Sequence, residues 1–219
     1  LNWLSLNPKK SEAIKFTSGR GQSRVEDIAS IAVSGVRIKP STVVKSLGVT
    51  FDGGLTFDQH IANVCKASYF HIRALRHVRK SLPDDVAKTV ACSMVGSRID
   101  YCNALLVGMS DSNFAKLQRV QNTLARVVLG LRKFEHITPA LIELHWLPVK
   151  QRVTFKLATL TMKTVHSGQP TYLRDLVNAY EPVRTLRSSS QHLLCVGRTR
   201  TVTAARSFRH SSATIWKSL

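Results

Sequence analysis

The spacing of apolar residues changes near residue 56, and this change constrains the fold more than any other feature of the sequence. From Phe57 onward, apolar side chains recur at three- and four-residue steps, which places them on one face of an α-helix. We therefore predict a mainly helical region after residue 56. Long helices are expected over about 57–80, 84–107, 111–131 and 149–167, and shorter ones over 138–144 and 213–219.

The first quarter of the chain contains short β-branched runs instead. Residues 31–33 and 36–38 flank a Ser-Gly pair and indicate a β-hairpin. Residues 43–51 form a second β-rich run, and a short strand is expected over 12–17 after the last turn of a helix over 1–6. The predicted fold class is therefore α+β. After Tyr180 the sequence becomes rich in Ser, Thr and Arg, with a weak strand signal over 193–196, and we expect looser packing there.

The chain carries a strong positive charge. Lys and Arg total 32 against 13 acidic residues, which gives a formal net charge of +19. A polyanion is the partner that this excess favours. A membrane surface is the alternative, but membrane-binding charge usually gathers in one tail or one amphipathic helix, and no apolar run is long enough for a membrane helix. The 4 scattered cysteines favour reduced thiols in the core of an intracellular protein.

Cations repeat along two of the predicted helices. Lys66, Arg73 and Lys80 follow a heptad spacing, with Arg76 beside them. The helix over 111–131 and the residues after it repeat this arrangement with Lys116, Arg119, Arg126 and Lys133. Two neighbouring helices could thus present these side chains to the phosphates of a nucleic acid. The alternative interpretation of each run is an ordinary solvated helix face.

The residues alone indicate no catalytic or metal centre. Asp84 and Asp85 are the only adjacent carboxylate pair, and such pairs can hold Mg²⁺. Both stand at the start of a predicted helix, where capping explains them, and Asp111 suits the same role in the next helix. His136 and His145 lie nine residues apart, which matches no zinc-binding spacing.

Several segments resemble the reverse transcriptases of non-LTR, LINE-type (jockey-like) retrotransposons, and together they span almost the whole chain. Residues 3–12 (Trp-Leu-Ser-Leu-Asn-Pro-Lys-Lys-Ser-Glu) resemble the segment after the catalytic aspartates, and residues 44–52 (Val-Lys-Ser-Leu-Gly-Val-Thr-Phe-Asp) resemble the primer grip. Five further segments follow in the order that the family's thumb has: 97–106 (Ser-Arg-Ile-Asp-Tyr-Cys-Asn-Ala-Leu-Leu), 117–122 (Leu-Gln-Arg-Val-Gln-Asn), 136–139 (His-Ile-Thr-Pro), 144–149 (Leu-His-Trp-Leu-Pro-Val) and 170–176 (Pro-Thr-Tyr-Leu-Arg-Asp-Leu).

The resemblance implies roles for particular residues. Lys10 would be the palm lysine near the phosphates of the incoming nucleotide, with Lys9 as the adjacent alternative. Leu47, Gly48 and Val49 would belong to the primer-grip hairpin, although a serine stands where the family usually has an aromatic residue. In the thumb, the resemblance implies core or inter-helix positions for Tyr101, Asn103, Asn122 and Trp146.

The resemblance also implies an organisation and a partner. Residues 1–56 would be a remnant of the palm with a primer-grip-like hairpin, residues 57–180 a helical thumb, and residues 181–219 a basic, loosely ordered region. The expected partner is the duplex of RNA template and DNA primer, in a nuclear or cytoplasmic ribonucleoprotein. The Tyr-x-Asp-Asp box and the other metal-binding aspartate would precede Leu1. We therefore expect this chain alone to be inactive and to hold no cofactor, whereas the intact parent polymerase would use Mg²⁺.

Two alternatives remain open at the level of the sequence. The chain could be a domesticated or relic nucleic-acid-binding module without enzymatic activity. It could also be a translated relic that does not fold alone.

Overall fold

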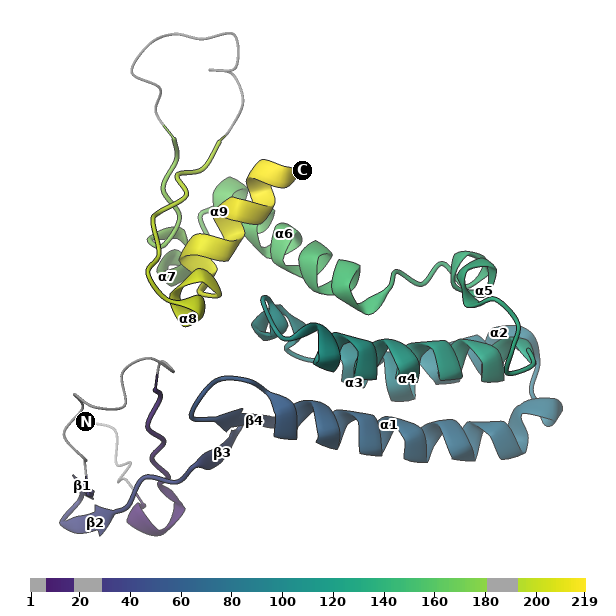
Figure 1. Ribbon diagram of the computed structural model, residues 1–219, viewed down its shortest axis with the longest axis horizontal. Helices are drawn as coiled ribbons and strands as arrows, with labels where there is room; N and C mark the ends of the chain where they lie inside the picture. Colours follow the sequence, from purple (N-terminus) through teal and green to yellow (C-terminus); the bar gives the residue numbers. More distant parts are fainter. Residues whose placement is uncertain (1–6, 18–28, 181–192) are drawn as a thin grey trace, which may run out of the picture. The chain divides into compact units, whose positions relative to one another are not determined.

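The structure is a computed structural model that describes residues 7–17, 29–180 and 193–219. The chain divides into two compact units, Leu1–Asn63 and Val64–Leu219, and each is described by itself. Two small β-hairpins lie in the first unit and the second is built of helices, so the predicted α+β class is confirmed (Figure 1). The helical turn expected over residues 1–6 lies outside the described residues.

The first hairpin pairs β1 (Ile31–Val33) with β2 (Val36–Ile38) in antiparallel register. Its two turn residues, Ser34 and Gly35, have φ angles of 46° and 82°. Two positive φ angles are typical of the type I′ turn, whose twist matches that of the flanking strands. The hairpin predicted from the sequence is thus confirmed.

The second hairpin pairs β3 (Val43–Ser46) with β4 (Val49–Asp52), so the β-rich run contains two strands. Its turn residues, Leu47 and Gly48, again have positive φ angles, of 46° and 83°. The preceding segment binds the open end of this hairpin, where the Thr17 amide donates to the Gly53 carbonyl at 2.9 Å.

The short strand predicted over 12–17 is not formed. A 3₁₀ turn, η1 (Pro8–Lys10), precedes this segment, and its only ladder contact among the described residues is an isolated bridge between Ile14 and Ser41. A strand needs a partner along its length, and here a single pair of residues meets.

The second hairpin leads directly into α1 (Asp58–Val78). The Asp52 carboxylate accepts hydrogen bonds from the Thr56 and Phe57 amides at 2.8 and 2.7 Å, which fixes the chain just before the helix. Phe57 is buried, with its ring 5.9 Å from that of Phe51. On the other side of this ring, His60 Nδ1 accepts from the Thr50 amide at 3.4 Å.

In the second unit, the rest of α1 is followed by a return segment and then by α4. The return segment consists of η2 (Arg79–Ser81), α2 (Asp84–Ala91), the π-helical η3 (Cys92–Gly96), α3 (Ser97–Asp100) and η4 (Asn103–Leu106). The single helix expected over 84–107 is therefore wrong at its end. Cys102 adopts a left-handed conformation with φ of 52°, which an α-helix cannot accommodate.

Helix α4 (Asp111–Leu129) supplies much of the core of this unit, including Leu117, Leu124 and Val128. Its N-cap is Ser110, whose side chain accepts from the Asn113 amide, and Asp111 takes the first helical position. Pro83 likewise precedes Asp84 in α2. The N-cap prediction was therefore one residue off for both aspartates, although a carboxylate in the first turn still interacts favourably with the helix dipole.

The remaining helices are α5 (Ile137–Glu143), α6 (Val149–Ser167), α7 (Thr171–Arg174), α8 (Val202–Ala205) and α9 (Phe208–Ser218). Helix α9 packs along α6 (Figure 1). The residues buried there are Val177, Leu194 and Ala213, against which Val165, Phe208 and Trp216 pack. Looser packing is predicted after residue 180, but α9 packs on α6, and residues 181–192 lie outside the described residues. The strand signal over 193–196 corresponds to an isolated bridge between Ala179 and Leu194.

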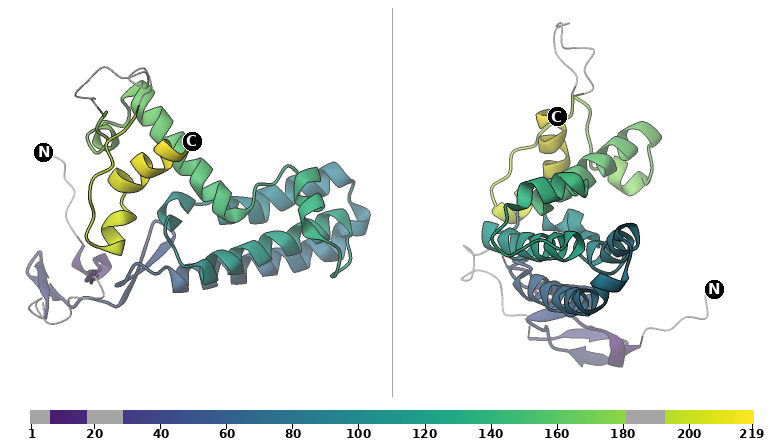
Figure 2. Two further views of the ribbon diagram at one scale, coloured as in Figure 1. Left: turned by 45° about the horizontal axis from the view of Figure 1, so that its top comes forward. Right: turned by 90° about the vertical axis from the view of Figure 1, so that its right-hand side faces the viewer.

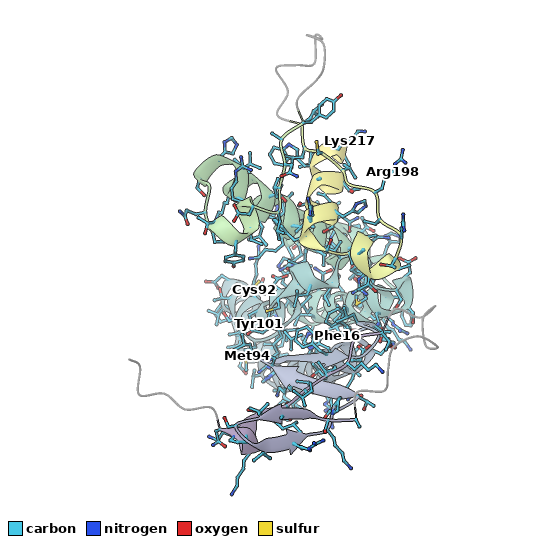
Figure 3. All side chains as sticks on the ribbon, turned by 90° about the vertical axis from the view of Figure 1, so that its left-hand side faces the viewer. Phe16, Cys92, Met94, Tyr101, Arg198 and Lys217 are labelled. Carbon is cyan, nitrogen blue, oxygen red and sulfur yellow. The ribbon has the colours of Figure 1, made fainter. Side chains whose placement is uncertain are left out.

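Two expectations about the core are wrong. The 4 cysteines are free, but Cys92, Cys102 and Cys195 are exposed and Cys65 is only half-buried. Tyr101, labelled in Figure 3, is 52% exposed. The cysteine assignment relied on apolar periodicity, and that of Tyr101 relied on the family resemblance. Around Cys92 and Cys102, the π-helical turn and the left-handed Cys102 change the direction of the side chains.

Candidate nucleic-acid interface

Within the second unit, α1 and α4 run side by side in the same direction (Figures 1 and 2). At one end, Arg79 Nε donates to the Val128 carbonyl at 2.7 Å. At the other end, burial raises the pKa of the Cys65 thiol, and the nearby charges of Lys116 and Arg119 oppose that shift. Because the helices are parallel, their last turns lie at the same end of the unit.

A cationic hollow of about 720 Å³ lies between these last turns. It is lined by Arg76, Arg79, Lys80, Thr123, Arg126, Val127, Gly130, Leu131 and Lys133. None of these lining residues is acidic. The hollow therefore combines five cations with a partly apolar wall.

The five cations do not have the same role. Arg79 is largely buried: it donates to the carbonyls of Val128 and Leu82 and forms an ion pair with Asp84. The charge of Arg79 is thus compensated by Asp84, and its hydrogen bond to Val128 joins η2 to the end of α4. The Arg126 guanidinium donates to the Glu135 backbone carbonyl at 3.2 Å, which leaves its charge uncompensated.

Local structure explains part of this clustering of cations at the ends of α1 and α4. The C-terminus of a helix carries a partial negative charge, so cations in the last turn are favourable. Yet two carbonyls at the C-terminus of α4 already have donors, since the amides of Gly130 and Leu131 donate to the Arg126 carbonyl and Arg79 donates to that of Val128. Lys80 and Lys133 lie beyond their helices, are exposed, and are not needed to cap them.

The structure brings together half of the predicted nucleic-acid-binding residues. The four that line the hollow are Arg76, Lys80, Arg126 and Lys133. The four that do not line it are Lys66, Arg73, Lys116 and Arg119. Lys66, Arg73 and Arg119 are exposed on their helices, whereas Lys116 is half-buried and donates to the Asn113 side chain at 2.9 Å. Sequence reasoning missed Arg79, whose position next to Lys80 was the available signal.

The residues assigned to the palm lie in the first unit. Lys10 is exposed at the end of η1, in the segment that joins the open end of the second hairpin. Leu47 and Gly48 form the opposite end of that hairpin, and the Leu47 side chain is 88% exposed. Val49 is buried beneath them. The Leu47 side chain at the tip is thus exposed, whereas Val49 is a core residue.

Side chains of the other thumb-like segments hold the second unit together. Gln121 Nε2 donates to the Leu147 carbonyl at 2.8 Å, and Gln118 Oε1 accepts from the Val149 amide at 2.9 Å. Gln118 also donates to Asn122 at 2.8 Å. Helix α4 is therefore tied to the chain that enters α6. Asn122 is half-buried, and its bond to Gln118 lies within α4 rather than between helices.

The segments over 97–106 and 144–149 also meet. Asp100 forms a two-armed ion pair with Arg152 on α6, and Asn103 and Trp146 are buried nearby. A smaller pocket of about 300 Å³ adjoins this pair, with both charge signs in its lining. Its mixed charge suits a polyanion less well than the cationic hollow does.

Other classes of site find little support in the described part of the chain. Within it, no three His, Cys, Asp or Glu side chains are grouped so as to hold a metal ion. Asp84 pairs with Arg79 instead. No described helix is both long and apolar enough to cross a membrane.

Comparisons with protein-family models, with curated proteins and with solved structures found no match to this chain.

Proposed function

We propose that this chain is the end of the palm and the thumb of a LINE-type retrotransposon reverse transcriptase, and that its task is to bind nucleic acid. The ordered segments of the sequence motivate the parentage. The cationic hollow is the observation that carries the binding function. Four uncompensated cations, from the last turns of two parallel helices and the residues that follow them, converge there with no acidic residue in the lining.

Binding would be electrostatic and independent of sequence. Arginine and lysine side chains attract phosphates, and each phosphate contact releases condensed counterions. Contacts of this type position a nucleic acid without reading its bases. In the parent polymerase, the hairpin tip at Leu47 and Gly48 would hold the primer end, and the template–primer duplex would contact the thumb. We assign binding, and no chemical step, to this chain.

The test compares two triple variants of the full chain. Replacing Arg76, Lys80 and Lys133 with Gln removes three cations of the hollow. Replacing Lys156, Lys163 and Lys217 with Gln removes three exposed cations on α6 and α9, of which Lys217 is labelled in Figure 3. Each variant lowers the formal charge from +19 by three, to +16.

Affinity for an RNA–DNA hybrid is measured by fluorescence anisotropy over a series of salt concentrations. The hollow variant should bind weakly, and the steepness of its plot of log affinity against log salt should fall by about two to three relative to the unaltered chain. The α6–α9 variant should keep a slope close to that of the unaltered chain. Equal losses of affinity in the two variants would mean that only net charge matters, and absence of binding by the unaltered chain would refute the proposed function.

The proposed parentage has a separate test. The genomic sequence upstream of the Leu1 codon should contain, in frame, a Tyr-x-Asp-Asp box. Unrelated coding sequence in that position would instead indicate a captured binding module.

A further inference from the structure

Phe134 is the most exposed of the described aromatic residues of the second unit. It follows Lys133 of the cationic hollow directly, and its side chain is 86% exposed. Aromatic rings are normally buried, because removing their large apolar area from water stabilises the fold. A single exposed ring can be incidental. The hydrogen bonds of the backbone around Phe134 show whether its segment is fixed in place.

A hydrogen-bonded turn holds the ring outward. The Glu135 amide donates to the Arg132 carbonyl at 3.3 Å, and the Arg132 amide donates to the Glu135 carboxylate at 2.6 Å. Lys133 and Phe134 occupy the two central positions of this turn. Arg126, a residue of the hollow, donates to the Glu135 carbonyl at 3.2 Å and so fixes the turn to α4. The exposed ring therefore lies on a tethered turn that also carries Lys133 of the hollow.

We propose that the cationic hollow and Phe134 together form a site for single-stranded nucleic acid. The phosphates bind Arg76, Lys80, Arg126 and Lys133, and an unstacked base packs on the Phe134 ring. This inference rests on the proposed nucleic-acid-binding function and names the form of nucleic acid that the site prefers.

The combination of cations with an exposed aromatic ring favours a single strand over a duplex. Bases in a duplex stack on one another, so their faces are covered, whereas an unpaired base can stack on an aromatic side chain. The hollow also has apolar walls at Val127 and Leu131, which suit the sugar and base of a nucleotide. Its volume of about 720 Å³ lies within the range of about 300–1,000 Å³ that is typical of small-ligand sites.

The test uses the full chain with Phe134→Ala and the matched control Phe155→Ala. Phe155 lies on α6, is 64% exposed, and lines the smaller pocket rather than the hollow. Binding of a single-stranded RNA, a single-stranded DNA and an RNA–DNA hybrid of the same length is measured by anisotropy at one salt concentration. Phe134→Ala should weaken single-strand binding about tenfold or more and change hybrid binding little. Phe155→Ala should change neither, and Phe134→Trp should restore single-strand binding.

The outcomes separate this inference from the proposed function. If Phe134→Ala leaves single-strand affinity unchanged, or lowers single-strand and hybrid affinity alike, the inference fails while nucleic-acid binding stands. If the unaltered chain binds none of the three probes, the proposed function fails as well. The salt dependence of binding gives a second readout. Because Phe134→Ala removes no charge, its slope of log affinity against log salt should equal that of the unaltered chain.

Discussion

Single polar side chains, rather than apolar contacts alone, join the helices of the second unit. Asp100 receives two hydrogen bonds from the Arg152 guanidinium and one from the Asn103 amide. The Arg152 side chain is 24% exposed and that of Asp100 is 38% exposed, so water screens the charges of this pair only in part. Asp111 and Lys150 form a contrasting pair with side chains 90% and 68% exposed.

Replacing Asp100 with Ala should lower the free energy of unfolding by about 1–2 kcal/mol, because Arg152 and Asn103 would lose their acceptor in a partly buried place. Urea-induced unfolding, followed by circular dichroism, measures this change. Replacing Asp111 with Ala is the control and should cost about 0.5 kcal/mol or less. A loss at Asp100 as small as that at Asp111 would mean that the pair does not stabilise the unit.

At the scale of elements, the junction between β4 and α1 depends on one neutral histidine. His60 Nδ1 accepts a hydrogen bond from the Thr50 amide, so this nitrogen must be unprotonated. Burial lowers the pKa of His60 below its ordinary value of 6.5. The folded chain therefore resists protonation at a pH where the unfolded chain accepts a proton.

This shift predicts a pH dependence of stability. Between the folded and unfolded pKa values of His60 the unfolded chain binds more protons, so the stabilisation is complete above pH 6.5 and is lost as the pH falls through the folded value. Melting temperatures of the full chain and of His60→Asn, measured across this range, check the prediction. The Asn amide oxygen can still accept from Thr50 but does not titrate, so the variant should show the smaller decline. Parallel declines would contradict the assignment.

At the scale of the whole molecule, charge opposes folding. The chain carries +19, and ion pairs between described residues include Arg79–Asp84, Lys150–Asp111 and Arg152–Asp100. Repulsion between cations therefore outweighs attraction, and compaction brings like charges closer together. Salt screens exposed charges more effectively than partly buried pairs.

The melting temperature should therefore rise when NaCl is increased from about 0.1 M to about 1 M, over which the Debye length falls from about 10 Å to about 3 Å. Differential scanning fluorimetry measures this shift. The variant in which Gln replaces Arg76, Lys80 and Lys133 should show a smaller rise, because its strongest local repulsion has been removed. A melting temperature that falls with salt would indicate that attractive pairs dominate.

Much of the fold was predictable from local signals. The Ser-Gly pair predicted the first hairpin because both residues can adopt positive φ, and the helical spacing predicted α1, α4 and α6. The left-handed Cys102, the π-helical turn at Cys92–Gly96 and the packing of α9 on α6 carried no such signal. The packing of α9 on α6 depends on contacts between segments distant in sequence.

The sequence by itself determined the net charge, the helical faces on which the cations stand and the position of the first hairpin, because these depend on residue type and spacing. Only the tertiary structure decided which cations meet. Periodicity fixes the face of a helix but neither its partner nor the register of packing. The parallel packing of α1 and α4 brings Arg76 and Lys80 together with Arg126 and Lys133, and leaves Lys66 and Arg73 outside the hollow.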